Sequence, residues 1–144
     1  MSPDLFRIVY YSRATRGGDS FPSLERILTA SRRNNARDGL TGTLLALDGS
    51  FAQVLEGEFD AVQRTFERIQ VDERHEDVIL LQAHLTSTRL FRGWTMELAS
   101  PDDPSAAHDV LRAAVAQSGR DSARRLVDLL HSLARREEWM ATPA

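Results

Sequence analysis

The dipeptide Asp48-Gly49 lies between two apolar, strand-like runs, LTGTLLAL at residues 40–47 and SFAQVLE at residues 50–56. Asp-Gly between two such runs is a strong signal for a two-residue β-hairpin, because this turn needs positive φ angles that few other residues tolerate. The sequence therefore predicts an antiparallel strand pair at this point. Every other element of the fold has to be arranged around that pair.

Further strand-like and helix-like segments flank this hairpin. Strands are indicated by short apolar runs rich in β-branched and aromatic residues, and helices by apolar residues at helical spacing. Strands are expected at residues 5–11, 40–47, 50–56, 78–85 and 93–99, and helices at residues 20–35 and 59–71. The order β-α-β-β-α-β-β predicts an α+β fold, a ferredoxin-like sandwich whose antiparallel-rich sheet carries both helices on one face.

The composition changes after the segment PDDPS at residues 101–105. Residues 106–117 and 122–136 have the pattern of two amphipathic helices separated by Gly119. About 40 residues are too few for an independent core. We therefore expect residues 1–100 to form one domain and residues 101–144 to form a helical extension that covers the other sheet face. Its helices, with Trp139 near the end, either complete a core or bind a second copy or a partner.

Gln53 interrupts an otherwise apolar strand face, because alternation places it between Phe51 and Leu55. Burying an amide without partners costs about 1–3 kcal/mol. A candidate partner is Tyr10, which shares a strand face with apolar residues and whose hydroxyl needs a hydrogen bond when buried. The sequence thus predicts that the two side chains meet.

Three other pairs of residues admit both a structural and a functional interpretation. Asn34-Asn35 either caps the first helix, which ends at Asp38-Gly39, or recognises the edge of a planar polar heterocycle. Arg68 and Asp72 have the spacing of a surface ion pair, or could hold a polyol or phosphate. Trp94 and Met96, on one face of the last strand, are typical core residues.

Several functional classes find no support in the sequence. A net charge of -3 gives no general affinity for nucleic acids or anionic membranes. With neither a spanning apolar run nor a signal peptide, a cytoplasmic protein is expected. The absence of cysteine excludes disulfides, thiolate metal sites and a cysteinyl cofactor adduct. The four histidines lack metal-ligand spacing, so no metal site is expected.

The chain resembles the BLUF family, the blue-light sensors using FAD. The resemblance covers about residues 5–98 and is carried, in order, by RIVYYS, SRRNNARDGLTG, FAQVLEGE, DERH and RLFRGWTM. The Asn-Asn–GLTG block followed by F-x-Q-x-LEG is highly specific. The family has the ferredoxin-like core expected above and holds FAD noncovalently between its two helices.

The resemblance implies a role for individual residues. Tyr10 matches the photoactive tyrosine, because the family spacing is Tyr-x-Ser, and Gln53 matches the switching glutamine. Asn35 matches the residue that binds the carbonyl and N–H edge of the flavin ring, with Asn34 beside it. The remaining implied contacts are Arg68 and Asp72 on the ribityl–phosphate side, Ile27, Leu40 and Phe51 around the ring, and Trp94 and Met96 on a strand that changes position or packing in the light.

In this family, excited flavin takes an electron and a proton from tyrosine. The glutamine then reorients or tautomerises, which strengthens a hydrogen bond to the flavin and shifts its absorption to the red. We therefore expect a photoreceptor and not an enzyme. With no room for a catalytic output domain in these residues, we expect signalling through a partner protein, and self-association into a dimer or larger oligomer.

Two rival functions remain. A small acylphosphatase-like hydrolase on the same fold would need an anion-cradling loop, for which the RGGD segment at residues 16–19 is a poor candidate. In a cofactor-free interaction module, Gln53 and the two asparagines would be structural only.

Overall fold

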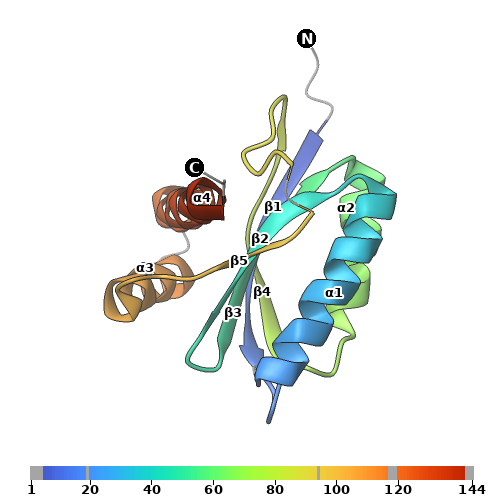
Figure 1. The fold of residues 1–144 in the computed structure, drawn as a ribbon. Helices are drawn as coiled ribbons and strands as arrows, with labels where there is room; N and C mark the ends of the chain where they lie inside the picture. The colour runs from blue at the N-terminus through green and yellow to red at the C-terminus, as the bar shows by residue number, and fades with distance from the viewer. Residues whose placement is uncertain (1–4, 19, 94, 117–119, 142–144) are drawn as a thin grey trace.

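The computed structural model describes residues 5–18, 20–93, 95–116 and 120–141, with the backbone alone for 21, 120 and 134–141. Along the chain the elements follow the order β-α-β-β-α-β-β, and two further helices come after them (Figure 1). The elements are β1 (Leu5–Ala14), α1 (Phe21–Asp38), β2 (Thr41–Leu47), β3 (Ser50–Gly57), α2 (Phe59–Gln70), β4 (His75–Thr86), β5 (Glu97–Ala99), α3 (Pro104–Ala116) and α4 (Arg120–Ala141).

The strands form one sheet in the order β4-β1-β3-β2-β5. β3 lies at the centre, between β1 and β2, and pairs antiparallel with both. β1 also pairs antiparallel with β4, and β2 pairs parallel with the short β5. The predicted ferredoxin-like α+β fold is therefore confirmed.

The β2–β3 hairpin turns where the sequence indicates. Asp48 has φ of 46° and Gly49 has φ of 80°, so both turn residues are left-handed, as a two-residue hairpin of this kind requires. Leu47 pairs with Ser50 directly across the turn, and the register then runs without a break to Thr41 opposite Glu56. This unbroken register determines which β3 side chains face each side of the sheet.

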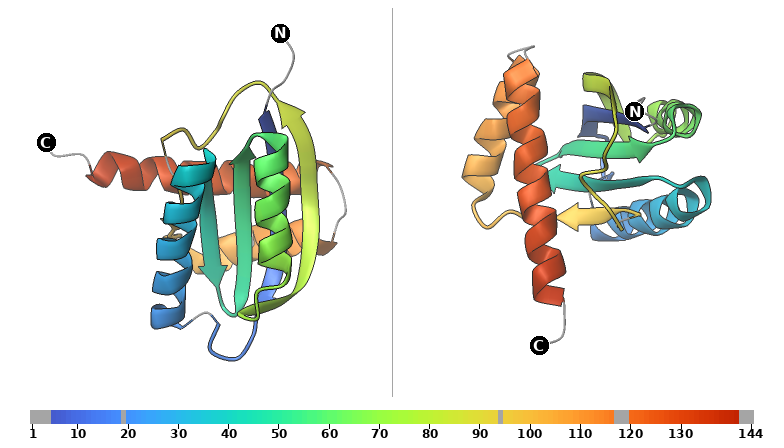
Figure 2. Two further views of the ribbon diagram at one scale, coloured as in Figure 1. Left: turned by 90° about the vertical axis from the view of Figure 1, so that its right-hand side faces the viewer. Right: turned by 90° about the horizontal axis from the view of Figure 1, so that it is seen from above.

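The sheet separates two helical layers. Figures 1 and 2 show α1 and α2 on one face and α3 and α4 on the other. Each layer closes its own apolar core: Ile8, Phe51 and Leu55 belong to the core under α1 and α2, whereas Val9 and Val54 belong to the core under α3 and α4. The C-terminal helices thus cover the sheet face opposite α1 and α2. Trp139 lies where only the backbone is described.

The last strand is shorter than predicted. β5 begins at Glu97, so the strand expected from residue 93 was wrong by four residues, and Met96 precedes the strand. The carbonyl groups just before β5 bind side chains of α1 in place of a sheet ladder: Asn35 Nδ2 donates to Thr95 O, and Arg32 Nε donates to Met96 O. Trp94 lies outside the described residues.

Candidate functional site

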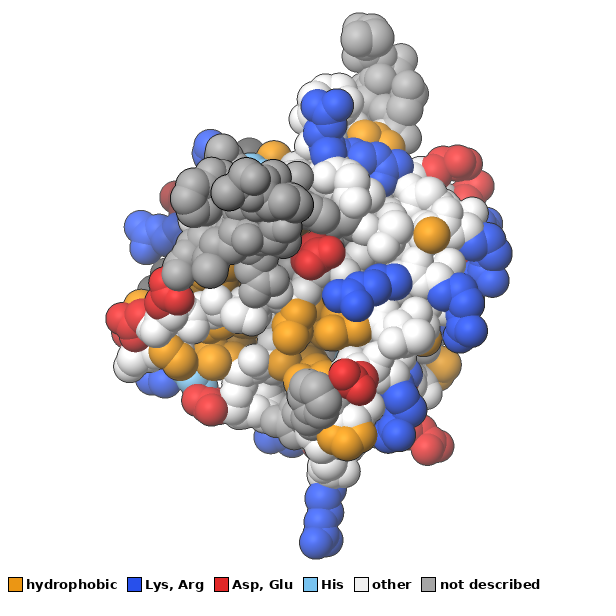
Figure 3. Space-filling model, in the orientation of Figure 1, with side chains coloured by type: hydrophobic (Ala, Val, Ile, Leu, Met, Phe, Trp, Pro, Cys, Tyr) orange, Lys and Arg blue, Asp and Glu red, His pale blue; other side chains and the backbone are white. Residues whose placement is uncertain are grey.

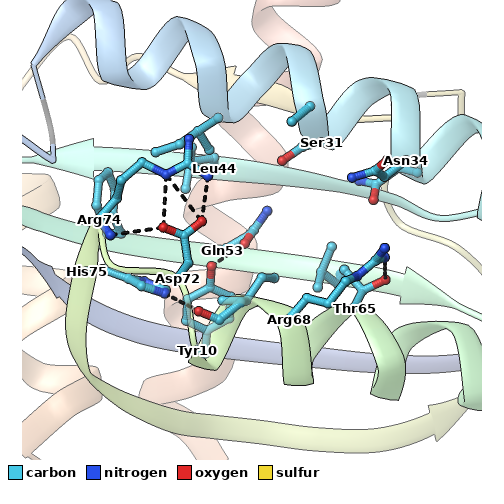
Figure 4. Close-up of a pocket in the computed structure, with 16 residues that line it drawn as sticks. Tyr10, Ser31, Asn34, Leu44, Gln53, Thr65, Arg68, Asp72, Arg74 and His75 are labelled. Atoms are coloured by element: carbon cyan, nitrogen blue, oxygen red, sulfur yellow. Dashed lines mark hydrogen bonds and ion pairs between the residues drawn. The ribbon is translucent and has the colours of Figure 1, made fainter.

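A cavity of about 140 Å³ lies between α1 and α2, above the sheet (Figure 4). α1 and α2 form its side walls, and strands β1, β2 and β3 form its floor. Apolar side chains make up much of the lining, and polar ones occur at both ends. The lining residues are Tyr10, Ile27, Ala30, Ser31, Asn34, Asn35, Leu44, Phe51, Gln53, Leu55, Thr65, Arg68, Ile69, Asp72, Arg74 and His75.

Tyr10 and Gln53 meet on the cavity floor, as the sequence predicts. They are directly opposite one another in the β1–β3 register, and the Tyr10 hydroxyl donates a hydrogen bond to Gln53 Oε1. Burial raises the pKa of the Tyr10 phenol far above its usual range, and the nearby Asp72 carboxylate raises it further. The phenol is therefore neutral at ordinary pH and available as a donor.

The other end of the Gln53 amide points at a thioether. Gln53 Nε2 donates to Met96 Sδ at 3.4 Å, and the Met96 side chain has no exposed surface. Sulfur is a weak acceptor, so this contact is much weaker than the phenol bond. A stronger acceptor within reach would compete with it readily.

The two asparagines lie inside the last turns of α1. The helix cap is Gly39, in the left-handed conformation with φ of 71°, so the interpretation of either Asn as the C-cap was wrong. Asn35 is 2% exposed and donates through Nδ2 to Thr95 O at 2.5 Å. Asn34 lies half-buried at the cavity wall. The Asn35 side chain therefore joins the cavity to the segment just before Met96.

Arg68 and Asp72 do not pair with each other. α2 ends at Gln70, so Asp72 lies beyond the helix and the i,i+4 geometry is lost. Arg68 donates to Asp38 Oδ2 at 3.4 Å and to Thr65 Oγ1 at 3.1 Å. Figure 4 shows Arg68 toward one end of the cavity and Asp72 toward the other. A ligand in the cavity would therefore meet them at different ends.

Asp72 pairs instead with Arg74. Arg74 Nη2 lies 2.5 Å from Asp72 Oδ2, and the Arg74 backbone N–H donates to Asp72 Oδ1 at 2.9 Å. The hydrogen bond from the Arg74 guanidinium lowers the pKa of the Asp72 carboxyl. This ion pair lies over the Tyr10–Gln53 pair, on the side toward α1 (Figure 4). It brings both charge and several hydrogen-bonding groups to this end of the cavity.

Of the expected apolar walls, Ile27 and Phe51 line the cavity and Leu40 does not. Leu40 is 1% exposed and lies in the same apolar core, but its side chain packs against Gly57. A Cβ added at Gly57 would lie 2.2 Å from Leu40 Cδ2. Leu44 and Leu55, from the predicted hairpin, line the cavity in addition.

His75 and Arg74 also line the cavity, although sequence reasoning did not assign them a role. His75 Nε2 lies 2.5 Å from Ile69 O, and Nδ1 lies 2.8 Å from Ser12 Oγ. Because a carbonyl only accepts, Nε2 carries the proton and Nδ1 accepts from Ser12. The imidazole thus ties the end of α2 to β1. The DERH segment at residues 72–75 was the available signal for both residues.

The residues that the structure describes contain neither a cluster of metal ligands nor a membrane-spanning helix. No three His, Asp or Glu side chains cluster as a metal site there. No helix in the same part of the chain is long and apolar enough to cross a membrane.

Comparison with known proteins identifies relatives that share this fold and sequence. Residues 5–97 match the family model "BLUF: Sensors of blue-light using FAD". Over 99 residues, or 68% of the chain, the sequence is 36% identical to the photoactivated adenylate cyclase subunit beta of Euglena gracilis, of which the match covers only 11%. The chain thus spans about a tenth of the length of the curated relatives that it matches.

Solved structures of BLUF proteins are also similar to this chain. The dark-state structure of BlrB, a BLUF protein, superimposes with a TM-score of 0.76 at 26% identity, over 92% of this chain and 98% of that one. BlrP1 of Klebsiella pneumoniae, solved with FMN and cyclic diGMP, gives a TM-score of 0.66 at 29% identity, over 89% of this chain and 34% of that one. The chain belongs to the BLUF family of flavin-based blue-light sensors.

Proposed function

We propose that this protein is a blue-light photoreceptor that binds FAD noncovalently and switches through Tyr10 and Gln53. The observation that carries the proposal is the Gln53 amide, buried on the floor of the cavity between a strong hydrogen-bond partner and a weak one. Membership of a sensor family supports the photoreceptor role. The family description names FAD, and the absence of cysteine supports noncovalent binding.

The cavity residues fit an amphipathic, planar ring. Ile27 and Ile69 provide apolar walls on the two helices, and the small Ala30 between the polar residues of α1 leaves room for a flat group. Hydrogen-bonding groups for a carbonyl and imide edge come from Asn35, whose Oδ1 can accept while Nδ2 holds Thr95. Arg74 can add donors at the opposite end. The lining is therefore apolar over the faces of a ring and polar around its edge.

The protein side of the mechanism follows from the two contacts of Gln53. Bound flavin would supply the absorption of blue light and an excited state that accepts an electron. Tyr10, held neutral by burial, would give up that electron and its hydroxyl proton through the hydrogen bond to Gln53 and would take both back once Gln53 has changed its hydrogen bonds, so that no net oxidation remains. Gln53 would then reorient or tautomerise, at the expense of its weak contact to Met96. A stronger hydrogen bond from Gln53 to the ring would give the red shift.

Output would pass from Met96 to the rest of the chain. We propose that residues 1–100 form the flavin-binding domain and that residues 101–144 are its extension. The extension packs on the sheet face opposite the cavity. Phe91, in the segment between β4 and β5, contacts His131 of α4 in an edge-to-face arrangement. Signalling to a downstream protein, and self-association, would use this helical layer. In this proposal the described residues act as a sensor, with no catalytic step of their own.

The first test is the visible spectrum. Purified protein should be yellow, should release its flavin on denaturation, and should show a small reversible red shift under blue light. Colourless protein that binds no added flavin would favour the cofactor-free module. Flavin that stays with the denatured chain would contradict noncovalent binding.

Three variants test the switch itself. Tyr10→Phe keeps the ring and removes only the hydroxyl, and Gln53→Leu keeps approximate size while removing the amide. Both proteins should fold and bind FAD but lose the reversible shift. Tyr11→Phe is the matched control, because Tyr11 faces the α3–α4 core and its hydroxyl meets Ser50 Oγ at 3.3 Å. If the Tyr10 and Gln53 variants both keep the shift, the photoswitch assignment is wrong.

A further inference from the structure

β4 is an edge strand without the side chains that usually protect an edge. It stands at one end of the sheet order and pairs with β1, and Figure 2 shows it along the rim of the sheet, beyond α2. Edge strands present unpaired main-chain N–H and C=O groups, which natural proteins shield with Lys, Pro or a very short strand. β4 has 12 residues, and its segment VILLQAHLT at residues 78–86 contains no Lys, Pro or acidic residue. Two register irregularities bend the strand but leave these main-chain groups in place.

Aliphatic side chains are exposed along this edge. Among the described residues, five large apolar side chains are exposed, and three of them lie on β4: Ile79 at 41%, Leu80 at 48% and Leu85 at 57%. Their partners in β1 place Leu80 and Leu85 on the α1–α2 side of the sheet and Ile79 on the α3–α4 side. The edge is therefore apolar on both of its faces.

The apolar surface continues from β4 onto α2. Leu85 is opposite Phe6 in the β1–β4 register, and the Phe6 ring packs against Phe59 with the ring centroids 4.8 Å apart. Phe59 is a fourth exposed apolar side chain, at 45%. The opposite side of the molecule, where β5 forms the other edge, carries acidic and basic side chains among its apolar ones (Figure 3). Unpaired main-chain groups beside exposed apolar side chains are typical of a surface that adds a β-strand.

The charges at one end of β4 determine the direction of an added β4 strand. Glu76 Oε1 and Asp77 Oδ2 lie 3.2 Å and 3.1 Å from the same atom, Arg13 Nη2, so two carboxylates share one guanidinium and this end is acidic. The rest of the strand, residues 78–86, has no acidic side chain. Parallel pairing of two such strands would bring the acidic ends together, which is unfavourable. Antiparallel pairing places each acidic end beside the acid-free end of the other strand, so β4 is complementary to itself in this direction.

We propose that β4 binds β4 of a second copy of this chain in antiparallel orientation, so that two sheets join across a two-fold axis. A contact of this kind uses the same surface on both chains, pairs their free main-chain groups and buries the aliphatic side chains on both faces of the edge. The surface lies at the rim of the sheet, apart from the α3–α4 layer, and adds a second contact to the self-association proposed there. It does not require bound flavin.

The experiment measures the molar mass of the full chain by light scattering over a range of concentrations, with and without added FAD. Wild-type protein should form at least a dimer in both cases. Leu85→Lys and Ile79→Lys each place a charge on one face of the edge and should weaken association about tenfold or more, with circular dichroism unchanged. Main-chain amides of residues 78–86 should exchange hydrogen more slowly in the associated wild type than in either variant, because edge pairing closes them. If one variant does not fold, the other variant and the exchange data decide.

Val71→Lys is the matched control, because Val71 is 79% exposed but lies beyond the end of α2 and outside β4. It should leave the molar mass unchanged. A monomeric wild type, whose edge is then left to a strand of some other protein, would overturn the inference. So would an equal loss of association in Val71→Lys, or association that persists in both β4 variants without protection of these amides. Because the contact needs no flavin, failure to bind flavin would overturn the proposed function and leave this inference standing.

Discussion

Glu56 of β3 offers the sharpest test of what holds this fold together. Its side chain has no exposed surface and accepts four hydrogen bonds. Arg7 Nε of β1 and the Leu90 backbone N–H each lie 2.8 Å from Oε2, while the Phe91 backbone N–H lies 2.9 Å and Thr41 Oγ1 3.2 Å from Oε1. One carboxylate thus fastens three strands to the segment that leads to Met96.

Glu56→Gln removes the charge with little change in shape. The new amide keeps one acceptor oxygen but presents N–H groups to two of the four donors, and it leaves the Arg7 guanidinium, which is 8% exposed, without its ion pair. Breaking a buried ion pair from one side costs about 3–5 kcal/mol. The total free energy of unfolding of a small domain is about 5–15 kcal/mol. We therefore expect a loss of about 3 kcal/mol, or roughly 10 °C in Tm for a domain of this size.

The measurement is urea unfolding of the flavin-loaded protein, followed by circular dichroism at one fixed flavin concentration, because bound ligand adds to the apparent stability. Glu25→Gln is the control: Glu25 is exposed on α1, and its replacement should change the unfolding free energy by less than about 0.5 kcal/mol. If Glu56→Gln unfolds within about 1 kcal/mol of the wild type, the carboxylate is not the anchor that its contacts indicate.

Three further outcomes are expected. Asn35→Ala should weaken FAD binding by about tenfold or more, since each lost buried contact costs about 1–3 kcal/mol; unchanged fluorescence titrations would show that Asn35 serves only the segment before Met96. Arg32→Gln removes the 2.9 Å bond to Met96 O and should slow recovery of the dark spectrum about fivefold without altering that spectrum, as timed absorbance would show. Because burial raises the Tyr10 pKa, an unfolded Tyr10 ionises first, so stability should fall above about pH 10; Tyr10→Phe should make the fall in urea midpoint less steep.

The part of the site that rests on strand geometry could be predicted from sequence. Once Asp48-Gly49 sets the turn, the alternation of side chains along a strand decides which face of the sheet each β3 residue occupies. Gln53 then has to lie on the same face as Phe51 and Leu55. The same rule places Tyr10 on the cavity side of β1. That the two residues are also direct cross-strand neighbours depends on the order of strands, which the ferredoxin-like pattern supplies.

The parts that depend on where an element ends could not be predicted. A spacing of four pairs Arg68 with Asp72 only while the helix continues, and α2 stops at Gln70. Asp72 then folds back on Arg74, two residues away, and Arg68 reaches Asp38, thirty residues away. The late start of β5 at Glu97 has the same origin, because the carbonyl groups of the two residues before it bind α1 side chains whose reach no local pattern encodes.

The two buried polar residues of β3 differ in a way that bears on switching. Glu56 faces the α3–α4 side and accepts bonds from a guanidinium, a hydroxyl and two backbone N–H groups, so any rotation of its side chain loses several strong interactions at once. Gln53 faces the cavity and has one strong partner, Tyr10, and one weak partner, Met96. Rotation of the Gln53 amide gives up little more than the sulfur contact, provided that the phenol can bond to either end of the amide. A neutral hydroxyl can do so, because it both donates and accepts. β3 therefore combines a rigid anchor on one face with a side chain of low rotational cost on the other, which is the energetic condition that the proposed switch requires.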